Sequence, residues 1–148
     1  MKLSTKSRYA VRAMVDLAVH YKKEPVQIKD IAKREKLSVR YLENIFTQLR
    51  ADGILNSEKG KGGGFYLSRK PTQITMLDIV QSVEGKLSIV DCVDFPSRCK
   101  KASICVSREV WQKISIGVKK ILKNITLQDL IISYKKKIGA SDNVLYYI

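Results

Sequence analysis

Hydrophobic residues recur at three- and four-residue spacing along most of the chain, which is the pattern of amphipathic helices. The first half predicts three such helices, at residues 7–21, 27–36 and 38–53. A short hairpin is predicted to follow, with Ile54 and Leu55 in one strand and residues 65–67 in the other. Three helices and a hairpin in this order are typical of a winged helix-turn-helix unit.

The third helix has clear signals at both ends and two different faces. Ser38 can cap its start by accepting a bond from a free backbone N–H, and Gly53 tolerates the positive φ that often ends a helix. The predicted inward face consists of Tyr41, Leu42, Ile45, Phe46 and Leu49. The remaining positions hold polar side chains that can hydrogen-bond to base edges or phosphates, namely Arg40, Glu43, Asn44, Thr47 and Gln48. This helix is therefore predicted to be a recognition helix.

Residues 58–64, Glu-Lys-Gly-Lys-Gly-Gly-Gly, place two lysines on a flexible tip with little side-chain bulk. Such a wing suits a minor groove or a phosphate backbone. Taken alone, either piece has a simpler interpretation, as a solvated hairpin or an ordinary amphipathic helix. Together, and after a second short helix at turn distance, they favour DNA binding. The candidate DNA-binding residues are Arg40, Tyr41, Glu43, Asn44, Lys59, Lys61, Gly62 and Gly63.

We divide the chain into a winged unit at residues 1–70 and a second part at 71–148. The second part is predicted to begin with a linker helix, whose start at Thr75 resembles a capping box with Asp78 in place of Glu. Residues 87–90 form a short apolar run that we expect to be extended. Residues 91–105 have no clear period, and we expect an exposed loop there.

The helical period returns from Ile104 and lasts for about twenty residues, or roughly 30 Å. Its apolar stripe consists of Trp111, Ile114, Val118, Ile121, Leu122 and Ile125. The stripe exceeds what a small winged domain needs, so we expect a dimerisation helix rather than an intramolecular core helix, because helix-turn-helix proteins usually bind paired half-sites. Thr126 is predicted to cap a last helix, with residues 135–137 at its C-terminal end. The apolar residues 144–148 are expected to pack. The predicted fold class is mainly α, a winged helix-turn-helix with a small β-hairpin wing plus this long dimerisation helix.

The net charge of the chain indicates what kind of partner it binds. The 148 residues carry a net charge of +14, and residues 1–70 hold 16 basic against 7 acidic residues. A polyanion bound in a salt-sensitive way is the natural partner. A membrane surface is the rival, but no helix is both strongly apolar on one side and basic on the other. No apolar run could cross a bilayer, and the N-terminus lacks the apolar core of a signal peptide, so we expect a cytoplasmic protein.

Cys92, Cys99 and Cys105 lie within fourteen residues. An odd number of cysteines in such a chain argues against a disulfide framework. Zinc would want a fourth Cys or His nearby, and the only histidine, His20, is far away in sequence. Iron–sulfur clusters are held by thiolates and sometimes accept another ligand. The spacing therefore leaves two equal alternatives, a metal centre or free, redox-responsive thiols. An enzyme is not expected, because C-x-x-C, a nucleotide-cradling loop and a Ser/His/Asp set are all missing.

Four segments are distinctive, together with the three cysteines near position 100: LSTKSRYAVRAMVDLA, SVRYLENIFTQLRADGIL, EKGKGGGFYLSR and NITLQDL. They resemble the IscR-like family of bacterial winged-helix transcription regulators. The resemblance covers nearly the whole chain. It implies a homodimer that binds double-stranded operator DNA, and our hypothesis is that the dimer is a repressor. It also implies an iron–sulfur cluster, 2Fe–2S or 4Fe–4S and absent in the apo form, on Cys92, Cys99 and Cys105. It matches Arg40, Glu43 and Asn44 to base-facing positions, Glu43 to a residue that separates two operator classes, and Lys59 to a minor-groove contact.

The chain departs from this family at the fourth cluster ligand. The cluster regulator has a histidine three residues after its last cysteine, where this chain has Arg108, and the nitric-oxide sensor has an acidic residue where this chain has Arg8. The open candidates are Glu109, Asp91, Asp94, Ser107, His20 or a small exogenous thiol. The C-terminal NVLYYI is more similar to the cysteine-metabolism branch, which works without a cluster. The alternative is therefore a cluster-free regulator of cysteine or sulfur metabolism, controlled by thiol oxidation or by a partner enzyme.

Overall fold

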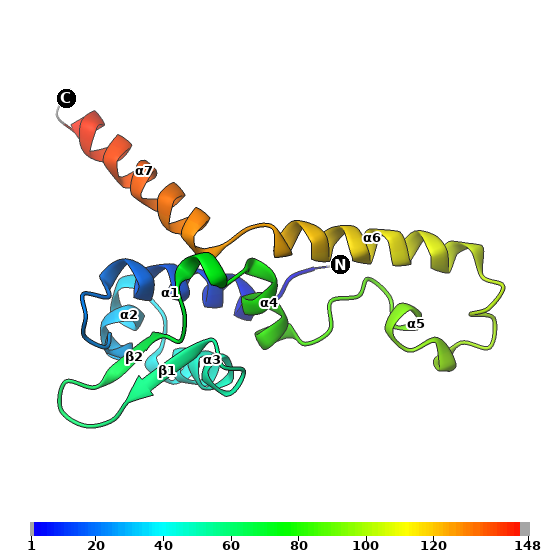
Figure 1. Cartoon of the computed structure of the whole chain (residues 1–148), viewed down its shortest axis with the longest axis horizontal. Helices are drawn as coiled ribbons and strands as arrows, with labels where there is room; N and C mark the ends of the chain where they lie inside the picture. The colour runs from blue at the N-terminus through cyan, green and yellow to red at the C-terminus, as the bar shows by residue number, and fades with distance from the viewer. Residues whose placement is uncertain (1, 146–148) are drawn as a thin grey trace.

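A computed structural model describes the backbone of residues 2–145 and the side chains of residues 2–141. The winged half contains α1 (Thr5–His20), α2 (Ile28–Glu35), α3 (Val39–Ala51), β1 (Leu55–Glu58) and β2 (Gly64–Leu67). The second half contains the 3-10 turn η1 (Pro71–Gln73), α4 (Met76–Glu84), α5 (Asp91–Asp94), the turn η2 (Pro96–Arg98), α6 (Val106–Lys123) and α7 (Leu127–Leu145). The fold is mainly helical with one small hairpin, which confirms the predicted winged helix-turn-helix (Figure 1).

The hydrophobic core lies among α1, α2, α3 and the hairpin. Its large, fully buried side chains include Phe46, Met14 and Leu17. The same core cluster also holds Ile79 from α4 and Leu127 from the first turn of α7. The two parts of the chain thus share one core, and the predicted division at residue 70 stays a prediction.

Local signals place the ends of α3 where the sequence predicts them. The Oγ of Ser38 accepts a bond from the backbone N–H of Tyr41 at 3.1 Å. At the other end Gly53 has φ of 74°, and its N–H donates to the carbonyl of Arg50 at 3.0 Å. The N–H of Ile54 then donates to the carbonyl of Leu49 at 2.9 Å. A positive-φ glycine with these two bonds is a common way to end a helix.

The wing is attached to the loop before α2. β1 and β2 are antiparallel, with Leu55 opposite Leu67. Val26 and Phe65 then exchange two backbone bonds, of 2.9 and 2.8 Å. Gly64 permits this close approach, because a Cβ at that position would lie 2.4 Å from the carbonyl oxygen of Val26. The base of the wing is therefore held against the helix-turn-helix by backbone contacts.

Two expectations for the second half are wrong. Residues 91–105 are not a plain loop, since α5 and η2 lie there; a helix of four residues is too short to show a period in the sequence. The last helix does not end near residues 135–137 but continues to Leu145. The single Gly139 costs a helix only about 1 kcal/mol, which is too little to end it. Residues 146–148 of the apolar tail lie outside the described residues, as do the side chains of Val144 and Leu145, so its packing stays a prediction.

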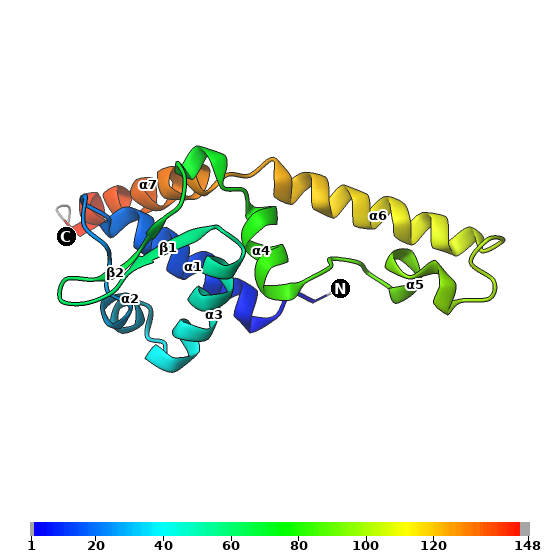
Figure 2. The same cartoon turned by 60° about the horizontal axis from the view of Figure 1, so that its bottom comes forward.

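The long helix α6 confirms the helix predicted from Ile104 onward, although Cys105 is its N-cap and Ile104 precedes it. α6 runs back toward the body from the outlying α5 (Figures 1 and 2). In the view of Figure 1, α7 then extends outward on the other side of the body. Only Ser115 of α6 is buried. Among the described residues, no helix is long and apolar enough to span a membrane.

Candidate nucleic-acid interface

The two faces of α3 are divided as the sequence predicts. Leu42, Ile45, Phe46 and Leu49 are buried in the core. Arg40, Glu43 and Asn44 are exposed, and so are Thr47 and Gln48 beside them. A row of exposed donors and acceptors on one helix face can contact base edges in a major groove. That these side chains bind DNA stays a prediction.

Tyr41 lies at the border between these two faces. It is half-buried, and its ring meets the ring of Tyr9 edge-on, with centroids 6.0 Å apart and planes at 87°. The ring of Phe46 likewise meets Phe65 of the wing at 5.1 Å and 75°. Edge-to-face aromatic pairs are favourable contacts, so both pairs help to fix the direction in which α3 presents its outer face.

The wing tip presents its two lysines on a tight glycine turn. Lys59 and Lys61 are exposed, and Gly60 between them has φ of 94°. Gly62 also has a positive φ, of 79°. The N–H of Gly63 donates to the carbonyl of Gly60 at 3.0 Å, and a Cβ on Gly63 would lie 2.3 Å from the carbonyl oxygen of Glu58. Gly63 is thus required by the turn itself, apart from any contact with DNA.

Four residues that were not predicted from the sequence brace this interface. Arg50 is exposed, and its Nη1 donates to the hydroxyl of Ser57 on β1 at 2.9 Å. The carboxylate of Asp52 accepts bonds from Ser82 of α4 at 2.5 Å and from Gln48 at 3.1 Å. These two bonds, the one from Ser82 first, lower the pKa of Asp52. Arg50 follows Glu43 by seven residues and could have been assigned to the same face by period. No signal near Ser82 indicates its contact with α3.

Two ion pairs attach the helix-turn-helix to α1. Asp16 is only 5% exposed, and the guanidinium of Arg34 donates to both of its carboxylate oxygens, with bonds of 2.7 to 3.1 Å. This hydrogen bonding raises the pKa of Arg34, against the opposite effect of burial. Arg12 pairs with Glu35, the last residue of α2, with 2.7 Å between Nη2 and Oε2. α1 and α2 are therefore joined by charged contacts at two points.

The three cysteines are not gathered into one site. Cys92 lies in α5, Cys99 follows η2 and Cys105 caps α6, each half-buried. Among the residues that the structure describes, no three His, Cys, Asp or Glu side chains are arranged to hold a metal ion. His20 is not near them; its Nδ1 lies 2.8 Å from the carbonyl oxygen of Asp16. The donor types suit an iron–sulfur cluster, but their arrangement here does not form a closed site for it.

Local bonds still connect the cysteine segment, which we define as residues 91–105, to α6. The Nε of Arg108 donates to the backbone carbonyl of Cys92 at 2.9 Å. Arg108 stands where the cluster regulator has its histidine ligand, and here it binds the backbone of the cysteine segment. The Sγ of Cys105 lies 3.2 Å from the hydroxyl of Ser107. That hydrogen bond, together with the backbone N–H of Arg108, lowers the pKa of the Cys105 thiol. A lowered pKa increases the fraction of reactive thiolate.

The fold, the polar face of α3 and the lysine-tipped wing define a winged-helix protein of the transcription-regulator class. Residues 3–133 match the model of the Rrf2 family, described as iron-dependent transcriptional regulator, and the chain belongs to this family. It is 37% identical to Protein rrf2 of Nitratidesulfovibrio vulgaris over 88% of this chain and 87% of that protein.

Two solved structures with similar sequences share the fold. T. potens IscR is 35% identical, with a TM-score of 0.74 over 93% of this chain and 90% of its own. CymR (YrzC), the global cysteine regulator of B. subtilis, is 36% identical, with a TM-score of 0.73 over 90% of this chain and 98% of its own. These likenesses confirm the resemblance predicted from sequence. They also place the chain among transcriptional regulators and not among enzymes, as expected.

Proposed function

We propose that this chain is a homodimeric repressor that binds double-stranded operator DNA through α3 and the wing. The observation that carries the proposal is that the exposed face of α3 and the exposed lysines of the wing belong to one braced unit. A hydrogen bond from Arg50 connects the end of α3 to Ser57 of β1. Backbone hydrogen bonds between Val26 and Phe65 hold the base of the wing. A recognition helix and a cationic finger held in fixed relation suit adjacent grooves of a duplex.

A binding titration tests the DNA contact. The double variant Arg40→Ala/Lys59→Ala removes one cation from the helix and one from the wing. We expect this variant to bind an operator selected from random duplexes at least tenfold more weakly than the parent chain does at moderate salt. The dependence of its affinity on salt concentration should also weaken. The double variant Lys135→Ala/Lys136→Ala removes two exposed cations from α7 and should bind as the parent chain does. Equal affinity of both double variants would refute the proposal.

The apolar face of α6 supports the homodimer. Trp111, Ile114 and Ile121 of the predicted stripe are 37%, 41% and 63% exposed in the single chain. Apolar side chains exposed along a whole helix usually mark a contact with another protein surface. A second copy of the helix would cover them and would bring two recognition helices into one assembly.

Sedimentation of a charge variant tests the dimer. Ile121→Glu places a carboxylate on the exposed apolar face and should shift the chain to monomer at micromolar concentration. Lys113→Glu, on an exposed polar position of the same helix, should stay dimeric. A parent chain that sediments as a monomer at working concentrations would refute the dimer, whatever the variants do.

We further propose that the cysteine segment is the sensing part of the regulator. Cys92, Cys99 and Cys105 would be the thiolate ligands of an iron–sulfur cluster, and the fourth ligand is open. A bound cluster would supply a centre that responds to iron supply, oxidants or nitric oxide. Because the thiols are apart in this structure, the cysteine segment would have to rearrange to hold it. The family description, iron-dependent, supports this candidate.

A second candidate needs no cluster, and two observations favour it. The described cysteines form no metal site, and the Sγ of Cys105 lies 3.2 Å from the hydroxyl of Ser107, a contact that lowers the pKa of the thiol. Thiol oxidation, or docking of a partner enzyme, would then control the dimer.

Iron analysis and an absorption spectrum after anaerobic purification separate the two candidates. A cluster requires iron that is lost when the three cysteines are replaced with Ala. Colourless parent protein that cannot be reconstituted yet binds DNA would exclude it.

A further inference from the structure

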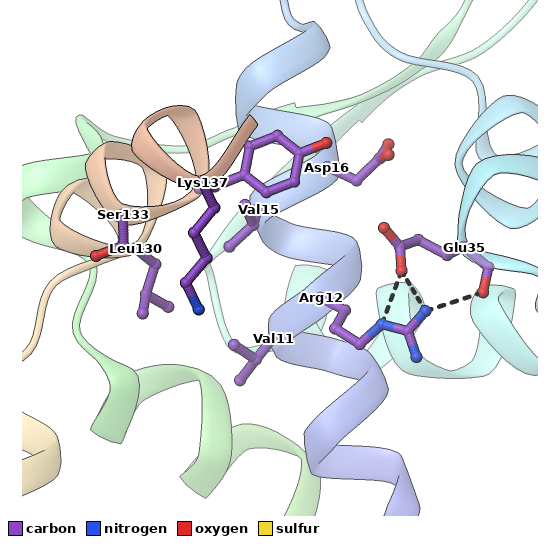
Figure 3. A pocket seen from close by; sticks show the side chains of 9 residues that line it. Val11, Arg12, Val15, Asp16, Glu35, Leu130, Ser133 and Lys137 are labelled. Carbon is purple, nitrogen blue, oxygen red and sulfur yellow. Dashed lines mark hydrogen bonds and ion pairs between the residues drawn. The ribbon is translucent and has the colours of Figure 1, made fainter. Parts of the chain in front are cut away.

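A cavity of about 310 Å³ opens between α1 and α7, away from α3, the wing and the cysteine segment. Figure 3 shows Val11 and Val15 on the side of α1 that faces α7, with Leu130 and Lys137 of α7 opposite them. Ser133 and Tyr134 complete the α7 wall. The volume is at the lower end of the range for small-molecule sites, which are mostly apolar with a few polar groups.

Among the residues that the structure describes, the charges around the cavity are paired except for one. Arg12 is paired with Glu35, and Figure 3 shows it pointing toward that residue and away from Lys137. Asp16 is paired with Arg34. No carboxylate among the described residues forms an ion pair with Lys137. The side chain of Lys137 extends along the cavity, with its ammonium beside Leu130 and Val11 (Figure 3).

We propose that this cavity binds a small amphipathic carboxylate. Its apolar body would pack against Val11, Val15 and Leu130, and its carboxylate would accept a bond from the ammonium of Lys137. An apolar wall beside a cation with no carboxylate partner among the described residues selects for this combination. A neutral molecule of the same shape would leave Lys137 without its partner, and a purely ionic one would gain nothing from the walls.

Occupancy of the cavity would fasten α7 to the helix-turn-helix. Residues 132–141 of α7 are all exposed, so few of the described side chains beyond Ile131 hold the helix to the body. α1, the other wall, is paired through Arg12 with Glu35 at the end of α2. A ligand that bridges the two walls favours the arrangement in which they lie close together, and would shift the population toward it. Any effect on operator affinity rests on the proposed function, whereas the binding site does not.

The full chain, labelled with nitrogen-15 and free of DNA, tests the site by titration with phenylbutyrate. We expect saturable shifts of the amide signals of Val11, Val15 and Ser133. The neutral analogue phenylbutanol should bind about tenfold more weakly, because it lacks the charge-assisted bond. Lys137→Gln should reduce the affinity for phenylbutyrate to that of the alcohol, and Lys136→Gln, exposed and outside the cavity, should not change it.

Three results would overturn the proposal. The first is the absence of saturable shifts at these three residues. The second is equal affinity for the acid and the alcohol, or equal loss in the two lysine variants. The third is a shift of the same signals with protein concentration alone, which would mean that a second copy of the chain fills the cavity. Because no DNA is present, none of these results bears on operator binding, which the titration of the Arg40/Lys59 variant tests separately.

Discussion

The backbones of Thr75 and Thr126 pair in an antiparallel bridge, although one residue caps α4 and the other precedes α7. The bonds on either side of the pair are both 2.8 Å, from Met76 to Ile125 and from Leu127 to Ile74. Each threonine also exchanges bonds with an aspartate three residues later, Asp78 or Asp129. Two helix starts of the same design, I-T-x-x-D, thus meet at one point, and they connect α4 to α7.

Removal of the cap at this junction should weaken the whole fold. Thr126→Ala loses the hydroxyl that accepts from the N–H of Asp129 at 3.2 Å. We expect the free energy of unfolding to fall by about 1 kcal/mol, the usual cost of a lost N-cap, as measured in urea. Thr72→Ala changes an exposed threonine of η1 and should have little effect. Equal stability of the two variants would show that the cap contributes nothing.

The free energy of unfolding should depend on pH through the carboxyl group of Glu84. Burial raises the pKa of this carboxyl, but the bonds from Ser4 and Ser7 at the start of α1 outweigh it and leave the pKa below its usual value. The folded pKa is lower than the unfolded one, so the stabilisation is complete above the unfolded pKa and is lost as pH falls through the folded pKa. Glu84→Gln should remove this part of the pH dependence in urea titrations across the acid range. Glu109→Gln, exposed on α6, serves as the control. The prediction fails if both variants follow the parent curve.

Gly64→Ala should detach the wing from the loop before α2. The new methyl group would lie 2.4 Å from the carbonyl oxygen of Val26, so the bridge between Val26 and Phe65 must open. We expect a loss of about 1–3 kcal/mol, as for other overpacked positions. Gly117→Ala on α6 meets nothing within 4 Å and should gain up to about 1 kcal/mol from helix propensity. Thermal or urea unfolding of the two variants gives the comparison, and a neutral Gly64→Ala would contradict it.

Glu43→Ala should relax the choice of operator more than it weakens binding. Its carboxylate is exposed on the outer face of α3, where it can accept a bond from the amino group of a cytosine. Loss of one such contact reduces discrimination by about 1–3 kcal/mol at the base that it reads. Selection from a random duplex pool should return a broader consensus at that position. Glu24→Ala, in the turn after α1, should return the parent consensus, and a consensus unchanged in both would exclude Glu43 from base reading.

The sequence by itself determined α3 and the wing hairpin. The alternation of Leu42 and Ile45 with polar positions, the cap at Ser38 and the positive φ at Gly53 act within a few residues of one another. Such local preferences can be recognised in a short window of sequence. The exposed face of α3 and the family followed from the same segments.

Only the tertiary structure decided how distant residues meet. The bond from Ser82 to Asp52, the pairing of Val26 with Phe65 and the cavity beside Lys137 all join segments far apart in the chain. These contacts form only when the core packs, and no local sequence pattern predicts them. The same reason applies to the cysteines: their spacing left a metal centre and free thiols as equal alternatives, and among the described residues the folded chain does not arrange the three thiols as a metal site.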